Sequence, residues 1–118
     1  MVALASFPGS GNTWLRYLLQ QITGIWTGSI YVDPVLAATG FIAEGIANNS
    51  VLFVKTHQHD KQDMFSFGKA VLVVRDPAEA ILSDFNWRNA GHLGHAGLHQ
   101  FNGTNEKGFI NANESFKQ

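Results

Sequence analysis

The stretch "SFPGSGNTWLRY" has the composition of a phosphate-binding loop that leads into a helix. Gly9 and Gly11 would let the backbone approach an anion closely, and the amides of residues 10–13 at a helix N-terminus would attract it. Hydroxyl donors in the same stretch are Ser10 and Thr13. A loop for nucleoside triphosphates requires G-x-x-x-x-G-K-[ST], and here the lysine is missing. The stretch predicts a phosphate site of another kind, with an ordinary glycine-rich turn as the alternative.

A second pair of reactive side chains occurs in "FVKTHQ". Lys55 and His57 follow an apolar run and are two residues apart, so in an extended chain they project to the same side. A histidine can accept a proton from a hydroxyl at neutral pH, and an ammonium group can stabilise developing negative charge. An exposed pair without a role explains this short pattern equally well.

A third candidate site occurs in "VVRDPAEAILS". Arg75 ends an apolar run, and Ser83 follows eight residues later in a predicted helix. A guanidinium group beside a hydroxyl is a good binding site for a phosphate. The alternative is that Arg75 pairs with Asp76 or Asp84, and for this motif taken singly that is the favoured interpretation.

Three apolar runs are predicted to be the strands that position these groups. They cover residues 2–6, 51–55 and 69–75, and the last two have the continuous apolar character of strands buried on both faces. A helix over residues 13–22 is predicted to bury one apolar stripe. The stripe would consist of Trp14, Tyr17, Leu18 and Ile22.

The other segments complete an alternation of strands and helices. Before the second strand we expect a loop over residues 24–33 and a weak helix over residues 34–47. Asp76 as N-cap and Pro77 at the first helical position start a helix that ends near Asn89. Residues 90–118 are irregular in pattern. The alternation predicts a parallel α/β sheet, and ligands of such sheets gather at the carboxyl ends of the strands.

Composition limits the classes of protein that fit. The chain has 118 residues, 45% of them hydrophobic and 14% charged, which indicates one small folded domain. A net charge of -1 gives no general attraction to nucleic acid or anionic membranes, and the absence of cysteine excludes disulfides and thiolate metal sites. No apolar run approaches the length of a membrane span, and we expect no targeting segment in this chain.

The segment "GHLGHAGLHQ" is a weak candidate for a metal site. It places His92, His95 and His99 at helix-like spacing. Three glycines disfavour a stable helix, and no carboxylate partner lies nearby in the sequence. We expect a solvated loop or a lip facing an acceptor, and no metal.

In combination, the three sites resemble the sulfotransferases that use 3′-phosphoadenosine 5′-phosphosulfate (PAPS). "SFPGSGNTW" resembles the 5′-phosphosulfate loop of that family, and "KTH" resembles the strand that carries its catalytic base. The spacing from Arg75 to Ser83 resembles that of its 3′-phosphate site. Within the family, "ALASFPGSGNTWLRYLLQQITGIWTGSIY" and "FNWRNAGHLGHA" look most like the WSC-domain-containing sulfotransferases, which are Golgi membrane proteins linked to glycan sulfation.

The resemblance implies a role for each candidate residue. The cofactor's 5′-phosphate and sulfuryl group would be bound by the loop residues Gly9, Ser10, Gly11, Asn12 and Thr13. Trp14 would stack on adenine, and Arg75 with Ser83 would hold the 3′-phosphate. His57 would be the general base, and Lys55 would assist it. PAPS would be the co-substrate. The acceptor would be a hydroxyl group, on a carbohydrate by resemblance. No metal and no nucleic acid would be needed.

The resemblance also implies a P-loop-type α/β sandwich of three layers, of which this chain would hold the PAPS-binding part and lack the membrane anchor. Residues 1–118 would thus be a partial sulfotransferase domain in the Golgi lumen, without the Gly- and Lys-rich segment that closes over the 3′-phosphate. Many relatives have a basic residue at the position of Gly9; its absence here is a departure, with substitution by Lys55 and low activity as the two alternatives. The alternatives are a kinase-like P-loop enzyme and a truncated, non-catalytic nucleotide-binding module.

Overall fold

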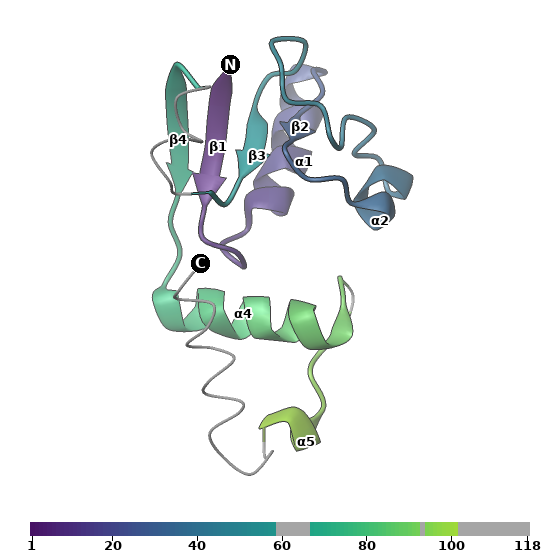
Figure 1. Cartoon of the computed structure of the whole chain (residues 1–118), viewed down its shortest axis with the longest axis vertical. Helices are drawn as coiled ribbons and strands as arrows, with labels where there is room; N and C mark the ends of the chain where they lie inside the picture. The colour runs from purple at the N-terminus through teal and green to yellow at the C-terminus, as the bar shows by residue number, and fades with distance from the viewer. Residues whose placement is uncertain (59–66, 93, 102–118) are drawn as a thin grey trace.

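The computed structural model describes residues 1–58, 67–92 and 94–101. Its centre is a parallel sheet of four strands in the order β2-β3-β1-β4 (Figure 1). The strands are β1 (Val2–Ser6), β2 (Gly28–Ser29), β3 (Val54–Thr56) and β4 (Lys69–Val73). Leu4 of β1 is in register with Lys55 of β3 and with Val71 of β4. The predicted parallel α/β sheet is therefore confirmed.

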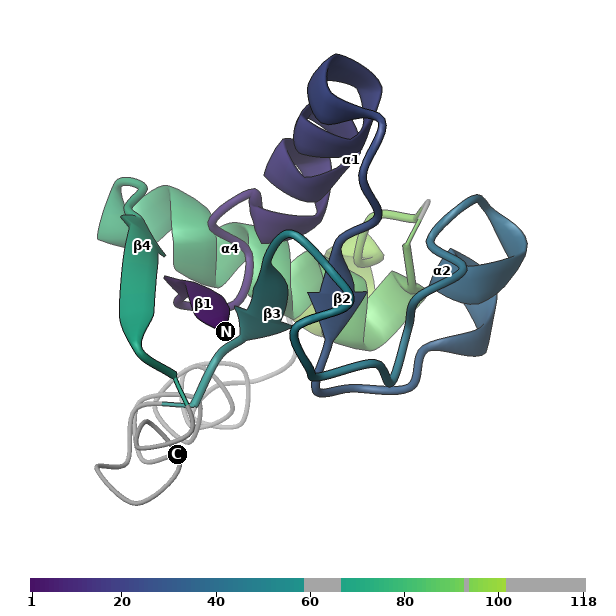
Figure 2. The ribbon, with the colours of Figure 1, turned by 90° about the horizontal axis from the view of Figure 1, so that it is seen from above.

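Helices lie against the sheet in two different ways. They are α1 (Asn12–Thr23), α2 (Pro34–Ala38), α4 (Pro77–Ala90) and the short α5 (Leu98–Phe101). Viewed from above, α1 covers one face of the sheet (Figure 2). Helix α4 instead crosses below the carboxyl ends of the strands, where the loop after β1 also lies (Figure 1). This crossing brings α4 to the edge where the predicted sites were expected to meet.

Capping residues explain where two of the helices begin. The Asp76 carboxylate accepts a hydrogen bond from the backbone N–H of Glu79, and Pro77 occupies the first turn of α4. The predicted start of this helix is confirmed. In the same way, the Asp33 carboxylate accepts from the N–H groups of Val35 and Leu36 at the start of α2.

Several predicted boundaries are wrong. The predicted loop over residues 24–33 contains the short strand β2, which local pattern did not indicate. Both residues of β2 pair with residues of β3. The predicted helix over residues 34–47 ends at Ala38, and Gly40, with φ of 109°, follows immediately. Strand β3 begins at Val54, so residues 51–53 are not part of it.

The predicted apolar stripe of α1 is also wrong. Trp14, Tyr17 and Ile22 are 68%, 51% and 79% exposed. The buried residues of the helix are instead Asn12, Arg16 and Gln20. The helix buries a polar face because its neighbours offer hydrogen-bonding partners there, which outweighs the apolar periodicity.

Strand β4 differs from its prediction in burial. It pairs with β1 along five residues, yet Val71 and Leu72 are 42% and 69% exposed. It is the edge strand of the sheet, and within the described part of the chain little covers its side chains. The three-layer sandwich stays a prediction, since α1 is the helix seen to cover a face (Figure 2). No helix in the described ranges is long and apolar enough to span a membrane.

Candidate functional site

The loop after β1 ends in a helix whose first amides have no side-chain cap. Gly11 is the residue before α1, with φ of 91°, and the first turn carries no acidic side chain. Such a helix start leaves backbone N–H groups available and favours an anion. The Asn12 side chain is turned into the sheet, where its Nδ2 donates to the Leu4 carbonyl at 2.8 Å and to Ser6 Oγ at 3.1 Å. The loop is thus fixed to β1, and the Ser10 N–H donates to the Phe7 carbonyl at 3.3 Å, while the amides at the start of α1 stay available.

Gly9 is packed directly against α4. Its φ is 77°, and a Cβ atom built there would overlap the Ala80 carbonyl oxygen and lie 2.9 Å from the Asp84 nitrogen. A side chain at this position would therefore push α4 away from the loop. This contact gives a physical reason for the missing basic residue: the space that it would need is occupied by helix backbone.

Lys55 reaches the same loop from the sheet. Its Nζ donates to Thr13 Oγ1 at 3.2 Å, which joins the middle of β3 to the first turn of α1. Burial lowers the pKa of Lys55 below its usual value, and the nearby Arg16 guanidinium lowers it further, while Glu44 and Asp33 act in the opposite direction. A cation in this position is suited to an anion bound at the loop.

The His57 ring is held in the tautomer that a general base needs. Its Nδ1 lies 2.8 Å from the Ser6 carbonyl oxygen and 3.2 Å from Ser6 Oγ. Because a carbonyl can only accept, Nδ1 carries the proton in this contact and Nε2 is the unprotonated nitrogen. Burial lowers the pKa of His57, and the hydrogen bond to Ser6 acts in the opposite direction. The charge of Lys55 lowers this pKa further, whereas the charge of Asp84 raises it. The ring is therefore kept neutral.

Tyr31 also contacts His57, and the sequence did not indicate it. The backbone N–H of His57 donates to the Tyr31 hydroxyl at 2.9 Å. The two rings are stacked, with centroids 5.6 Å apart and planes at 25°. Tyr31 is the second residue after β2, so its position depends on a strand for which the sequence shows no periodic signal.

Arg75 and Ser83 approach the loop from the opposite side. Arg75 Nη1 donates to the Gly9 carbonyl at 3.0 Å, and Ser83 Cβ is next to the position of a Gly9 side chain. The alternative pairing of Arg75 with Asp76 or Asp84 is not what is seen, because its ion-pair partner is Glu79, at 3.1 Å. The structure therefore brings the two predicted residues to one place, behind the loop.

A pocket of about 290 Å³ opens beside Arg75. It is mostly apolar, and its lining includes Phe7, Ser10, Leu72, Val74, Arg75 and Ile81. Trp14, the predicted adenine platform, is not among the lining residues and projects from α1 into solvent. The pocket thus joins the loop to the Arg75 site on the β4 side of the sheet.

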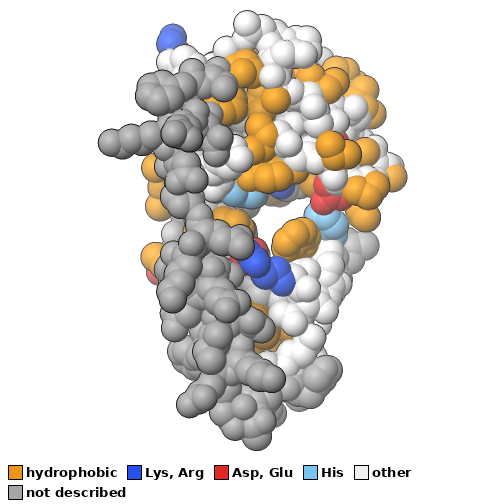
Figure 3. Space-filling model, in the orientation of Figure 1, with side chains coloured by type: hydrophobic (Ala, Val, Ile, Leu, Met, Phe, Trp, Pro, Cys, Tyr) orange, Lys and Arg blue, Asp and Glu red, His pale blue; other side chains and the backbone are white. Residues whose placement is uncertain are grey.

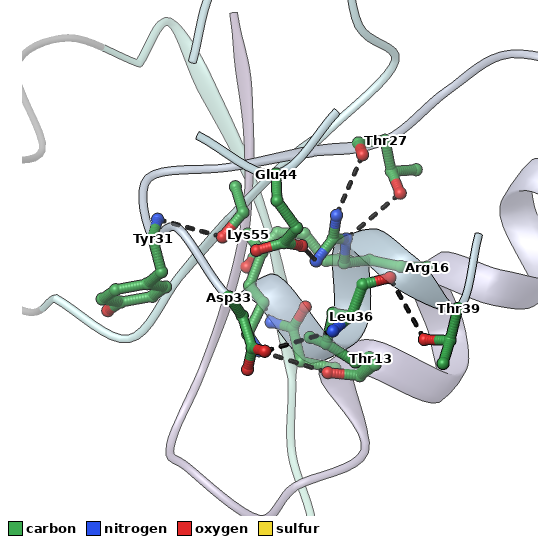
Figure 4. Close-up of polar contacts among 12 residues, drawn as sticks. Thr13, Arg16, Thr27, Tyr31, Asp33, Leu36, Thr39, Glu44 and Lys55 are labelled. Atoms are coloured by element: carbon green, nitrogen blue, oxygen red, sulfur yellow. Dashed lines mark hydrogen bonds and ion pairs between the residues drawn. The ribbon is translucent and has the colours of Figure 1, made fainter. Parts of the chain in front are cut away.

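A buried polar network fixes the elements around Lys55 (Figure 4). Arg16 is fully buried and pairs with Glu44 at 2.5 Å, while its other nitrogens donate to the side chain and carbonyl of Thr27. Phe41 packs on the guanidinium, 4.7 Å from ring centroid to Cζ. Burial lowers the pKa of Arg16, and the bond to Glu44 opposes this. The network ties α1 to the segment after α2.

A hollow separates the sheet from α4 on the face shown in Figure 3, and side chains of His, basic and acidic residues surround it. His92 Nε2 donates to the Asp33 carboxylate at 2.8 Å, which connects the start of α2 with the segment after α4. The His92 ring also lies edge-on to Trp87, at 5.9 Å. His92 and Asp33 are 59 residues apart in the sequence, and no local pattern predicted their contact.

The predicted histidine cluster does not form a metal site in the described residues, where no three His, Cys, Asp or Glu side chains gather closely enough. His92 pairs with Asp33, and His95 is exposed. The side chain of His99 lies outside what the structure describes.

Comparison with known proteins finds relatives of this chain. A WSCD family member of Drosophila pseudoobscura pseudoobscura and one of Drosophila melanogaster are each 56% identical over 107 residues, which cover 91% of this chain. One of Aedes aegypti is 60% identical over 96 residues, 81% of the chain. The chain is a homologue of proteins named WSCD family members. It spans about a third of their length, 34% of the Drosophila proteins and 30% of the mosquito protein.

The comparison with known proteins rests on sequence identity to these WSCD relatives. No family model and no solved structure matches the chain. The predicted resemblance to WSC-domain-containing proteins is therefore supported by name and identity, and the roles of individual residues rest on the geometry.

Proposed function

We propose that this chain is the PAPS-binding part of a sulfotransferase that transfers a sulfuryl group to an acceptor hydroxyl. The observation that carries the proposal is the His57 tautomer: a half-buried, neutral imidazole with Nε2 unprotonated, at the strand edge that also bears an uncapped helix start. A phosphate loop without the triphosphate lysine, next to a histidine base, suits a reaction that needs a phosphate leaving group and deprotonation of a hydroxyl.

In the proposed reaction the acceptor oxygen attacks the sulfur atom of PAPS. His57 Nε2 takes the hydroxyl proton as the new O–S bond forms and the bond from sulfur to the 5′-phosphate oxygen breaks. The electron pair stays on the phosphate, where the loop amides from Ser10 to Thr13 and the Lys55 ammonium stabilise it. The 3′,5′-ADP product then dissociates.

The cofactor would extend from His57 across the loop toward Arg75. Its 5′-phosphate would occupy the helix start, and Arg75 with Ser83 would bind the 3′-phosphate. For Arg75 this requires release of the exposed Glu79 pair, an exchange of low cost because such pairs contribute about 0–1 kcal/mol. The apolar pocket beside Arg75 offers space for part of the nucleoside, and Trp14 is available as a stacking surface.

A carbohydrate acceptor and a place in the Golgi belong to the same proposal. Both come from the resemblance to WSC-domain-containing sulfotransferases, and the named relatives are consistent with it. The hollow between the sheet and α4 in Figure 3 is the region where the acceptor would enter.

Ligand-induced thermal stabilisation tests the proposal on the full 118-residue chain. We expect 3′,5′-ADP to raise the melting temperature more than ATP with magnesium does, and Arg75→Ala to abolish the difference. Lys69→Ala is the matched control, since it removes a positive charge from the amino end of β4, far from the loop. A larger shift with ATP and magnesium would favour the kinase-like alternative. Binding of 3′,5′-ADP without any PAPS turnover would favour the non-catalytic module.

A further inference from the structure

Tyr31 holds His57 by two independent contacts. Its hydroxyl oxygen accepts the His57 backbone N–H at 2.9 Å, and its ring lies stacked on the imidazole with the planes at 25°. The first contact fixes the main chain where β3 has just ended. The second fixes the plane of the ring about its side-chain torsions.

Tyr31 is itself anchored by the segment that follows β2. Its N–H donates to Ser29 Oγ at 3.0 Å, and its carbonyl accepts the N–H of Gly45 at 2.8 Å. Gly45 is next to Glu44, whose carboxylate is paired with the buried Arg16. Tyr31 therefore connects the histidine to the segment that carries the buried ion pair, through hydrogen bonds to His57 and to Gly45, and its ring points away from that pair in Figure 4.

Ser6 and Tyr31 constrain the imidazole in different ways. Ser6 fixes which nitrogen carries the proton, because its carbonyl accepts from Nδ1. Stacking by Tyr31 covers one face of the ring and so limits the direction in which Nε2 points. A general base must lie within hydrogen-bond reach of the proton that it accepts, so this direction affects the rate.

We propose that Tyr31 is a positioning residue that orients His57 Nε2 toward the acceptor hydroxyl, with its ring as the essential part. The inference rests on the proposed sulfotransferase function. The aromatic ring acts on the imidazole, while the hydroxyl acts on the backbone, so substitutions can separate the two contributions.

Two variants and one control test this role. Tyr31→Phe keeps the stacking ring and removes the hydroxyl, whereas Tyr31→Leu removes both. Tyr17→Leu applies the same change to a tyrosine that is 51% exposed on α1 and serves as control. Each protein is labelled with ¹⁵N and ¹³C for NMR, which reports the protonation midpoint and tautomer of His57 without any need for turnover.

In Tyr31→Leu we expect the His57 midpoint to rise toward the ordinary value near 6.5, because the ring becomes more hydrated. The groups that also act on this midpoint, Lys55 and Asp84, are unchanged in all variants. PAPS turnover should fall about tenfold or more. The acidic limb of its pH–rate profile should move to higher pH by the same amount as the His57 midpoint. In Tyr31→Phe the midpoint should stay near that of the wild type, and turnover should fall less.

Affinity for 3′,5′-ADP separates a positioning role from general damage to the fold. It should be the same in Tyr31→Leu and Tyr17→Leu as in the wild type, since Tyr31 is not at the loop. An unchanged His57 midpoint and tautomer in Tyr31→Leu would overturn the proposal, as would equal turnover in Tyr31→Leu and Tyr31→Phe. A moved midpoint together with no PAPS turnover by the wild type would support the contact and overturn the sulfotransferase function.

Discussion

The two halves of the sheet are built on different principles. Around β2, β3 and α1, polar side chains are fully buried and hydrogen-bonded; Arg16, Thr27, Ser29 and Thr56 have no exposed surface. In the other half the strand itself is exposed: Leu72 of β4 is 69% exposed, and Val74, directly after it, is 78% exposed. The first half holds His57 and Lys55, and the second holds Arg75 and Ser83. The side with His57 and Lys55 is thus held by bonds among buried polar groups, whereas the side with Arg75 and Ser83 has little packing of its own among the described residues.

The first prediction concerns the buried Arg16–Glu44 ion pair in the half around β2, β3 and α1. Glu44→Ala leaves the Arg16 guanidinium buried without its partner, and we expect the free energy of unfolding to fall by about 3–5 kcal/mol. Urea unfolding followed by circular dichroism measures it. The matched control is Glu79→Ala, which removes the carboxylate of an exposed pair on α4 and should cost about 0–1 kcal/mol. Similar losses in the two variants would contradict the contrast between the halves.

The second prediction concerns the point where the two halves meet, at Gly9. Gly9→Lys introduces a basic residue beside the loop, yet it should lower both stability and 3′,5′-ADP affinity because it displaces α4. Gly11→Lys is the control, since Gly11 also has positive φ but no atom within 4 Å of an added Cβ. Both variants share a backbone cost of about 1–3 kcal/mol.

The difference between these two glycine variants in urea unfolding isolates the contact of the loop with Ala80. We expect Gly9→Lys to be the less stable of the two. If Gly9→Lys instead binds 3′,5′-ADP more tightly than the wild type does, the packing of α4 against Gly9 is not what keeps a cation out.

The third prediction uses the lowered pKa of His57. Below about pH 6.5 the unfolded chain binds a proton at this residue that the folded chain resists. The contribution of neutral His57 is therefore fully present above that pH and is lost as the pH falls toward the folded pKa. The wild type should lose stability over this window relative to His57→Gln, which has no titrating group, as followed by unfolding at a series of pH values. Parallel curves for the two proteins would show that burial does not disfavour the imidazolium.

The smallest effect is expected on β4. Leu72→Ser replaces a side chain that is 69% exposed, so stability in urea should change by no more than about 0.5 kcal/mol. Leu4→Ala, in the neighbouring strand and fully buried, should cost about 2–5 kcal/mol. A large loss for Leu72→Ser would mean that β4 is covered in the folded protein.

Local sequence signals predicted the elements that have strong signals of their own. The run of residues 2–6 gave β1 with its observed bounds, and Asp76-Pro77 gave the start of α4. Strand β2 was missed because two residues carry no period, and it forms only because β3 pairs with it. The apolar face assigned to α1 was wrong because Arg16 is bonded to Thr27 and Glu44, which lie outside the helix, 11 and 28 residues further along the chain.

The sequence by itself determined the parallel sheet, the loop after β1 and the types of the candidate residues, because strand periods, caps and glycine spacing act over short distances. Only the tertiary structure decided how these residues meet. It placed Tyr31 on His57, Lys55 on Thr13 and Gly9 against α4. The physical reason is that these contacts join residues at least 26 positions apart in the chain, and their geometry follows from strand order and helix crossing, which no local pattern encodes.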